Sequence, residues 1–155
     1  MKFKIQTKDL KDIVGSVSRV VDPRPTTPAL QGLYIKAHRD TVEVIGSDLD
    51  VVLKARTETP VEVDGESLVN ARVLSEIVRK LPSGEVVFSD VGSEIKVEIK
   101  KLDFVLRKLD EKTYPETLLN ETEKKDSKAI ETDDLFESLK KVGIATSPEG
   151  GRPTL

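Results

Sequence analysis

Short stretches in which apolar and polar residues alternate recur along the chain as far as residue 107. A period of two is typical of β-strands that have one buried and one solvated face. Turn-forming pairs, such as Asp64-Gly65 and Ser83-Gly84, lie between these stretches. The pattern therefore predicts antiparallel sheet with one solvated face, with strands at residues 2–6, 33–37, 41–45, 51–57, 61–63, 85–89, 94–99 and 103–107.

Two segments follow the helical period of 3.6 residues instead. The first is predicted over residues 7–21, with Thr7 as its N-cap and Pro23 beyond its end, and its apolar face consists of Leu10, Ile13, Val14, Val17 and Val21. The second is predicted over residues 71–81, between the N-cap Asn70 and Pro82, and its apolar face consists of Leu74, Ile77, Val78 and Leu81. A strand, a helix, several strands, a second helix and more strands predict the α+β fold class.

The polar faces of both predicted helices carry basic residues. A helical projection places Lys8 and Arg19 opposite the first apolar face. Arg72 and Arg79 lie opposite the second, and Lys80 flanks them. One interpretation is a pair of solvated helices of mixed charge, since each polar face also contains an acidic residue. The other is that both faces present Arg and Lys to one polyanion, and the pattern alone leaves the two interpretations open.

The start of the chain is repeated near its end. Residues 3–10 (FKIQTKDL) correspond to residues 128–135 (KAIETDDL). Each copy continues into a helical pattern and then into Arg-Pro-Thr, at residues 24–26 and 152–154. Internal similarity of this kind indicates a duplicated domain.

The repeat predicts how the chain is divided. We expect a domain at residues 1–119, a polar linker at 120–128, and the first strand and helix of a second, incomplete domain at 129–155. A lone strand and helix cannot bury enough apolar surface to fold independently. The last segment is therefore expected to dock on the first domain, to exchange with another copy or to stay partly disordered, and the chain is expected to be a fragment of a longer protein.

Composition narrows the classes of function. The 25 basic and 28 acidic residues give a net charge of −3, which argues against a module that grips nucleic acid over most of its surface but leaves a local basic face possible. Aromatic residues make up only 4%, few for a protein that stacks bases on aromatic side chains. The N-terminal sequence has no long apolar run, so we expect a cytoplasmic protein without a membrane partner.

No group of residues indicates catalysis or a bound cofactor. The chain has no cysteine, and its one histidine, His38, is predicted in a solvated hairpin turn. Asp48 and Asp50 could share a strand face, but no further acidic residue or histidine accompanies them, so they are interpreted as turn and strand-start residues. The sequence has no glycine-rich phosphate-binding motif. We expect no catalytic residue, no metal and no cofactor.

Four motifs in order carry a family resemblance. They are RPTTPAL at residues 24–30, GSDLDVVLKAR at 46–56, VNARVLSEIVRKLP at 69–82 and FVLRKLDEKTYPE at 104–116. Together they resemble the N-terminal domain of the bacterial sliding clamp, the β subunit of DNA polymerase III. The resemblance runs from Met1 to about Leu119 and resumes at Ala129.

The resemblance implies a DNA-clamp fold and a non-enzymatic function. Clamps of this family are head-to-tail homodimers of three-domain subunits that close around duplex DNA, with two helices of each domain on the inner wall and antiparallel sheets outside. Such a processivity factor tethers the replicative polymerase without reading sequence. The polymerase and the clamp loader bind through domains mostly absent here. The alternative is a truncated clamp-like module that binds or modulates clamp rings.

The resemblance also implies site residues. Arg24 and Arg72 match family positions that face DNA, and the helical projection adds Lys8, Arg19, Arg79 and Lys80.

A second group matches the dimer contact. Phe104 and Leu106 correspond to an apolar pair on the strand that meets the neighbouring subunit, and Lys101 corresponds to a basic position beside it. The sequence departs from the family at Asp103, where a basic residue is common, which puts the strength or salt dependence of the contact in question.

Overall fold

The computed structural model of the chain describes residues 1–120 and 130–146. The chain divides into two compact units, Met1–Asn120 and Glu121–Leu155. The first unit contains a β-sheet and the two predicted helices, and the second contains one described helix. No helix of the described residues is long and apolar enough to span a lipid bilayer.

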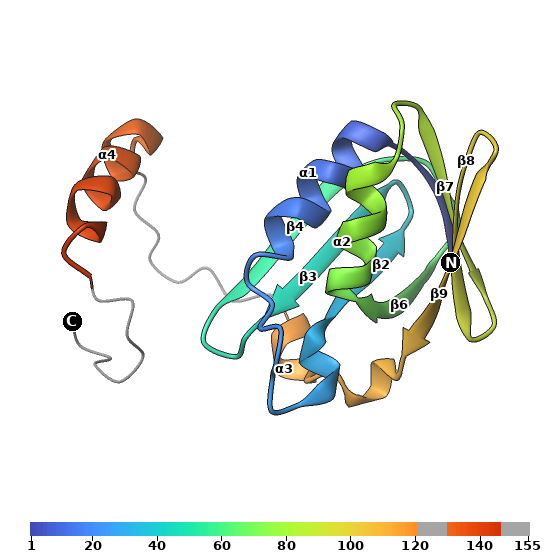
Figure 1. Cartoon of the computed structure of the whole chain (residues 1–155), viewed down its shortest axis with the longest axis horizontal. Helices are drawn as coiled ribbons and strands as arrows, with labels where there is room; N and C mark the ends of the chain where they lie inside the picture. Colours follow the sequence, from blue (N-terminus) through green and yellow to red (C-terminus); the bar gives the residue numbers. More distant parts are fainter. Residues whose placement is uncertain (121–129, 147–155) are drawn as a thin grey trace. The chain divides into compact units, whose positions relative to one another are not determined.

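In the described residues of the first unit, nine strands form one antiparallel sheet in the order β4-β3-β2-β6-β9-β8-β7-β1-β5 (Figure 1). The strands are β1 (Lys2–Gln6), β2 (Gly32–His38), β3 (Thr41–Ser47), β4 (Val52–Glu58), β5 (Val61–Val63), β6 (Gly65–Asn70), β7 (Glu85–Val91), β8 (Glu94–Ile99) and β9 (Leu102–Leu109).

Strand β9 connects the two halves of this sheet. Its first six residues pair with β8, and its last two, Lys108 and Leu109, pair with Val69 and Leu68 of β6. Within the described residues, the edge of β9 that faces away from β8 has no strand partner from Leu102 to Arg107. This part of the strand therefore presents unpaired backbone groups, although β9 lies in the middle of the strand order.

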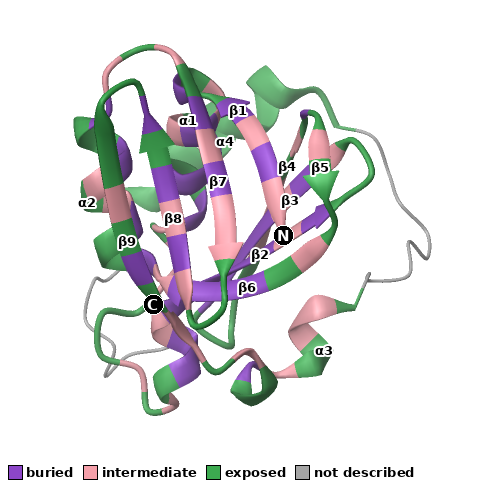
Figure 2. Cartoon of the chain, turned by 90° about the vertical axis from the view of Figure 1, so that its right-hand side faces the viewer, coloured by how far each residue is buried: buried purple, intermediate pink, exposed green. Residues whose placement is uncertain are grey.

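Two helices, α1 (Thr7–Val17) and α2 (Ala71–Lys80), lie side by side on one face of the sheet (Figure 1). Their predicted apolar faces are confirmed, since most of these residues are buried against the sheet: Leu10, Ile13, Val14, Val17, Leu74 and Val78. The strands bury alternate residues, as the purple positions of β7 and β8 show in Figure 2. In β1 and β7 the rings of Phe3 and Phe88 stack with their centroids 5.0 Å apart. One core thus fixes both helices to the sheet.

A second, smaller core covers the other face of β2, β3 and β6. It contains Tyr34, Ile45 and Leu68 of these strands, together with Tyr114 and two residues of the 3-10 helix η1 (Pro28–Gln31). The 3-10 helix η2 (Glu111–Thr113) precedes Tyr114, and the short helix α3 (Glu116–Leu119) follows it. The expected solvated face therefore exists on β1, β7 and β8, whereas β2 is buried on both faces for most of its length.

Two expectations for this unit are corrected, and one strand was missed. Thr7 is the first residue of α1 and not its N-cap, because its hydroxyl donates to the carbonyl oxygens of Pro82 and Gly84 at 2.9 and 2.8 Å. The helix ends at Val17 and not at residue 21. The Ser18 hydroxyl donates a hydrogen bond to Val14 O, and the amides of the next two residues donate to carbonyl oxygens three residues earlier, as in a 3-10 turn and not an α-helix. Strand β6 was not predicted.

The second unit contains helix α4 (Thr132–Gly143), at the place where the sequence repeat predicts a helix. None of its residues is buried. Ile130 and Glu131 precede it and form no strand. Most of the predicted linker, at residues 121–128, and the second Arg-Pro-Thr sequence, at 152–154, lie outside the described residues.

Candidate nucleic-acid interface

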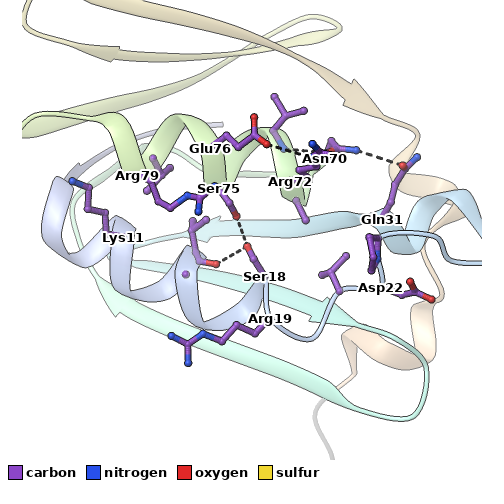
Figure 3. Close-up of a pocket in the computed structure, with 17 residues that line it drawn as sticks. Lys11, Ser18, Arg19, Asp22, Gln31, Asn70, Arg72, Ser75, Glu76 and Arg79 are labelled. Carbon is purple, nitrogen blue, oxygen red and sulfur yellow. Dashed lines mark hydrogen bonds and ion pairs between the residues drawn. The ribbon is translucent and has the colours of Figure 1, made fainter. Parts of the chain in front are cut away.

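A groove of about 1010 Å³ runs between α1 and α2 on the side that faces away from the sheet (Figure 3). Both helices contribute to it, together with the loop after α1 and the residues that precede α2. Four basic and two acidic residues line it: Lys11, Arg19, Arg72, Arg79, Asp22 and Glu76. The groove is therefore lined by charged side chains that come from two separate parts of the sequence.

The N-terminus of α1 is fastened to the chain that leaves α2. The Thr7 hydroxyl and the Thr7 amide both donate to Gly84 O, at 2.8 and 2.9 Å. One turn further along α1, Lys11 Nζ donates to Leu81 O at 2.9 Å. The start of α1 therefore lies beside the end of α2, so the two helices run in opposite directions.

A pair of serines connects the helices at the other end. Ser18 Oγ lies 2.6 Å from Ser75 Oγ and 2.6 Å from Val14 O (Figure 3). A carbonyl oxygen only accepts, so Ser18 donates its one hydroxyl hydrogen to Val14 O, and Ser75 donates to Ser18. These contacts hold the two walls of the groove together.

The positive charge of this face lies mainly on α2. Helix α1 carries two lysines and two aspartates, whereas α2 carries three basic residues and one glutamate. Arg79 and Lys80 lie in the last turn of α2, where a positive charge also interacts favourably with the helix dipole. A locally basic surface thus occurs on a chain whose net charge is −3.

The six candidate DNA contacts are all exposed, but the groove brings only half of them together. Arg19, Arg72 and Arg79 line it. Lys8 and Lys80 lie beyond it, at the end where α1 begins and α2 stops. Arg24 lies in the loop after α1. Because α1 ends at Val17, Arg19 belongs to this loop and not to the polar face of a helix.

Lys11 is a lining residue that is not among the six candidates. Its spacing of three residues from Lys8 puts both on neighbouring positions of one helix surface, and that spacing was the available signal. Its amino group is already used by Leu81 O. Lys11 therefore contributes to holding α1 against α2 as well as to the charge of the groove.

The basic residues differ in whether their side chains have a protein partner. Arg72 Nε donates to Glu76 Oε1 at 3.1 Å, and Lys11 is bound to Leu81 O. In the described part of the chain, five others make no side-chain hydrogen bond or ion pair: Lys8, Arg19, Arg24, Arg79 and Lys80. These five are available to an external anion without breaking a contact.

The candidate dimer residues lie around the free edge of β9. Lys101 is exposed in the turn before it, Phe104 is half-buried, and Leu106 is only 4% exposed because its side chain packs in the core. The exposed apolar side chains of this strand are Leu102 and Val105, at 46% and 50%. The surface that another molecule would meet therefore differs from the apolar pair expected from the sequence.

The remaining candidates lie in turns and at strand ends. His38 is the exposed last residue of β2, and its Nδ1 lies 2.5 Å from Asp64 Oδ2. Asp48 Oδ1 accepts the amides of Asp50 and Val51 at the tip of the β3–β4 hairpin, which agrees with its interpretation as a turn residue. Among the residues that the structure describes, no group of three potential ligands could hold a metal ion.

Comparison with known proteins identifies relatives over the whole chain. A family model described as "DNA polymerase III beta subunit, N-terminal domain" matches residues 1–119. The beta sliding clamp of Micrococcus luteus is 33% identical over 115 residues, which cover 74% of this chain and 37% of that protein. That of Bacillus subtilis is 33% identical over 165 residues, which cover 100% of this chain and 43% of that protein.

Comparison with solved structures identifies the same family. The crystal structure of the Bacillus subtilis sliding clamp matches with a TM-score of 0.88 and 32% identity, and the match covers 99% of this chain and 42% of that chain. The chain thus spans about two fifths of the length of the relatives that it matches.

Proposed function

The chain belongs to the family of the bacterial DNA polymerase III β subunit, the sliding clamp, and we propose that it is part of a processivity factor that encircles duplex DNA and tethers the replicative polymerase. Its α+β architecture is the sliding-clamp fold. The observation that supports a role on DNA most directly is the surface formed by α1, α2 and the loop after α1, here called the α1–α2 face. There, five basic side chains have no partner in the described residues, and the helices present no base-reading aromatic residue.

A ring explains why few protein–DNA contacts are enough to keep such a protein on DNA. A closed ring keeps DNA inside by topology, so its contacts to phosphates can be weak and water-mediated. Phosphate contacts position a protein without reading sequence, which suits a subunit that slides. We propose Arg24, Arg72, Arg19, Arg79, Lys8 and Lys80 as the DNA-facing residues of this unit.

The free edge of β9 is the proposed contact with a second subunit in a head-to-tail homodimer. We retain Lys101 and Phe104, and add Leu102 and Val105, because these two are exposed. Leu106 is proposed to support the edge from the core.

Asp103 adds negative charge at this edge. It pairs with Glu98 of β8, so two acidic residues lie opposite each other. Like charges on neighbouring strands repel. We therefore propose that the partner subunit offers basic residues here and that the contact weakens as salt rises.

The sliding-clamp family consists of non-catalytic accessory factors, and we propose that this chain has no catalytic residue of its own. The replicative polymerase and the clamp loader are proposed to bind outside the described residues. The cytoplasm is the proposed site of action.

Binding of the full chain to two short duplexes of unrelated sequence tests the proposed role on DNA. We expect equal affinities and a linear fall of log K with log salt concentration, because the contacts are to phosphates. A clear preference for one sequence, or no binding even at low salt, would contradict the proposal.

A further inference from the structure

The only acidic residue of α2 lies among its basic residues in the groove. Glu76 lines the groove together with Arg72 and Arg79, one helical turn from each (Figure 3). Its side chain is 48% exposed, so its negative charge faces solvent on the same surface as the cations. A polyanion that approaches α2 therefore meets one negative charge beside three positive ones.

Glu76 also determines what Arg72 can do. The Arg72 side chain is 86% exposed, and its Nε donates to Glu76 Oε1 at 3.1 Å, four residues along the helix. Arg79 lies three residues from Glu76 and makes no side-chain hydrogen bond or ion pair within the described residues. The carboxylate thus lies against one arginine and leaves the other available.

This arrangement bears on how strongly DNA can be held. A phosphate that takes Arg72 must compete with the Glu76 carboxylate and is repelled by it at short range. An arginine paired in this way neutralises a phosphate less completely than an unpaired one, so fewer counterions are released from the DNA. An exposed pair of this kind contributes little to the stability of the helix.

We propose that Glu76 is a positioning residue that limits the affinity of this face for DNA, by holding Arg72 along the helix and by placing a negative charge in the groove. The inference rests on the proposed function and deepens it. Weak contacts favour movement along the duplex, and Glu76 supplies a way to keep them weak without removing the basic residues.

The test is a titration of the ¹⁵N-labelled full chain with a short duplex of mixed sequence, followed by NMR at several salt concentrations. Glu76→Gln keeps the shape of the side chain and removes its charge. It is expected to bind about two- to threefold more tightly at low salt and to show a steeper salt dependence, by at most about one phosphate contact. Glu58→Gln is the matched control, because Glu58 is exposed at the end of β4, outside both the groove and the free edge of β9, and carries the same charge.

Two further variants separate the two actions of Glu76. Glu76→Asp keeps the charge and should bind no more tightly than the wild type. In an Arg72→Ala background, Glu76→Gln should lose most of its effect. An equal gain in both backgrounds would overturn the positioning role, since the charge alone would then explain it.

The outcomes distinguish this inference from the proposed function. If the duplex shifts no α1, α2 or Arg24 resonances in the wild type, the proposed DNA-facing surface is wrong and the inference falls with it. If it shifts them and Glu76→Gln binds with unchanged affinity and salt dependence, only the role of Glu76 is overturned. The amide spectrum of each variant shows directly whether the fold is retained.

Discussion

At the scale of single residues, the basic side chains of the α1–α2 face fall into two groups. Arg72 and Lys11 already have protein partners, whereas Arg79 and Arg24 have none for their side chains in the described residues. An unpaired cation neutralises a phosphate without losing another contact. The contributions to DNA binding are therefore expected to follow the availability of each side chain rather than its match to a family motif.

Arg79→Ala is accordingly expected to weaken duplex binding by the full chain more than Arg72→Ala. Loss of one phosphate contact should lower the slope of log K against log salt by about 0.9. Fluorescence anisotropy with a labelled duplex measures both quantities, and Arg107→Ala, on the exposed face of β9, is the control. A larger effect of Arg72→Ala would show that the Glu76 pair does not restrain Arg72.

Asp90 connects three strands of the sheet. Its Oδ2 accepts hydrogen bonds from Ser67 Oγ of β6 at 2.8 Å and from Lys108 Nζ of β9 at 2.9 Å. Burial raises the pKa of Asp90, but the hydrogen bonds from Lys108 and Ser67 and the charge of Lys108 bring it below the ordinary value of an aspartate. A carboxyl group with a lowered folded-state pKa stabilises the fold above its unfolded pKa, and this contribution is lost as the pH falls through the folded value.

Asp90→Asn is therefore expected to lower the free energy of unfolding at neutral pH by about 2 kcal/mol, because it leaves Lys108 without its charged partner. The difference from the wild type should shrink below a pH of about 4, where the unfolded-state carboxyl takes up its proton. Urea denaturation across a pH series measures this, with Asp50→Asn in the exposed β3–β4 turn as the control. A difference that does not change with pH would contradict the assignment.

The residues also show what local sequence can predict. Asn70 was expected to cap the second helix, and its side chain accepts the Val73 amide at 3.1 Å. Thr7 fitted the same pattern, yet its hydroxyl bonds to Pro82 O, 75 residues away. Asn70 caps its helix and Thr7 does not, because Thr7 makes a tertiary contact that a local pattern does not contain.

At the scale of elements, the position of α1 depends on that tertiary contact. Thr7 is buried, and its hydroxyl donates to two carbonyl oxygens in the segment that follows α2. Thr7→Val keeps the shape of the side chain and leaves both carbonyls without this donor. It is expected to lower the free energy of unfolding by about 1–2 kcal/mol in urea denaturation. Thr26→Val, at an exposed loop position, should change it by less than about 0.5 kcal/mol, and equal effects at the two sites would contradict the role of Thr7.

Neighbouring residues of β9 are expected to have different effects. Leu106 is buried in the core, so Leu106→Ala should lower the free energy of unfolding by about 2–4 kcal/mol. Val105 is 50% exposed at the proposed subunit contact, so Val105→Lys should leave stability nearly unchanged and weaken self-association of the protein that carries this chain. Denaturation and sedimentation at several dilutions measure the two effects. A dimer unaffected by Val105→Lys would exclude this edge as the contact.

Periodicity predicted the type of most elements but not their arrangement. The apolar faces of α1 and α2 repeat strictly, and both helices were found. Strand β6 was missed, because its sequence GESLVN has little alternation and its residues Ser67, Leu68 and Val69 are all buried between two cores. The pairing of β6 with β9 joins residues about forty positions apart, and no local signal specifies it.

At the scale of the whole molecule, the distribution of charge and the family match both agree with the proposed role on DNA. The chain is acidic overall, yet seven of its 25 basic residues lie on α1, α2 and the loop after α1, beside four acidic ones. When the rest of a protein is acidic, repulsion of phosphates there confines DNA binding to the local basic surface. The pattern of residues alone left both a solvated helix pair and a polyanion-binding face open. The family match, together with the groove, favours the second.

The central claim, that this chain belongs to a ring around duplex DNA, is tested most directly by retention on circular DNA. The gene product that carries the chain is loaded by a clamp loader onto nicked circular DNA, isolated by gel filtration, and followed before and after a restriction enzyme makes the DNA linear. The account predicts that the protein stays on the circle and is released once the DNA has ends. Retention that does not change on linearisation would contradict it, because the protein would then be held by contacts and not by topology.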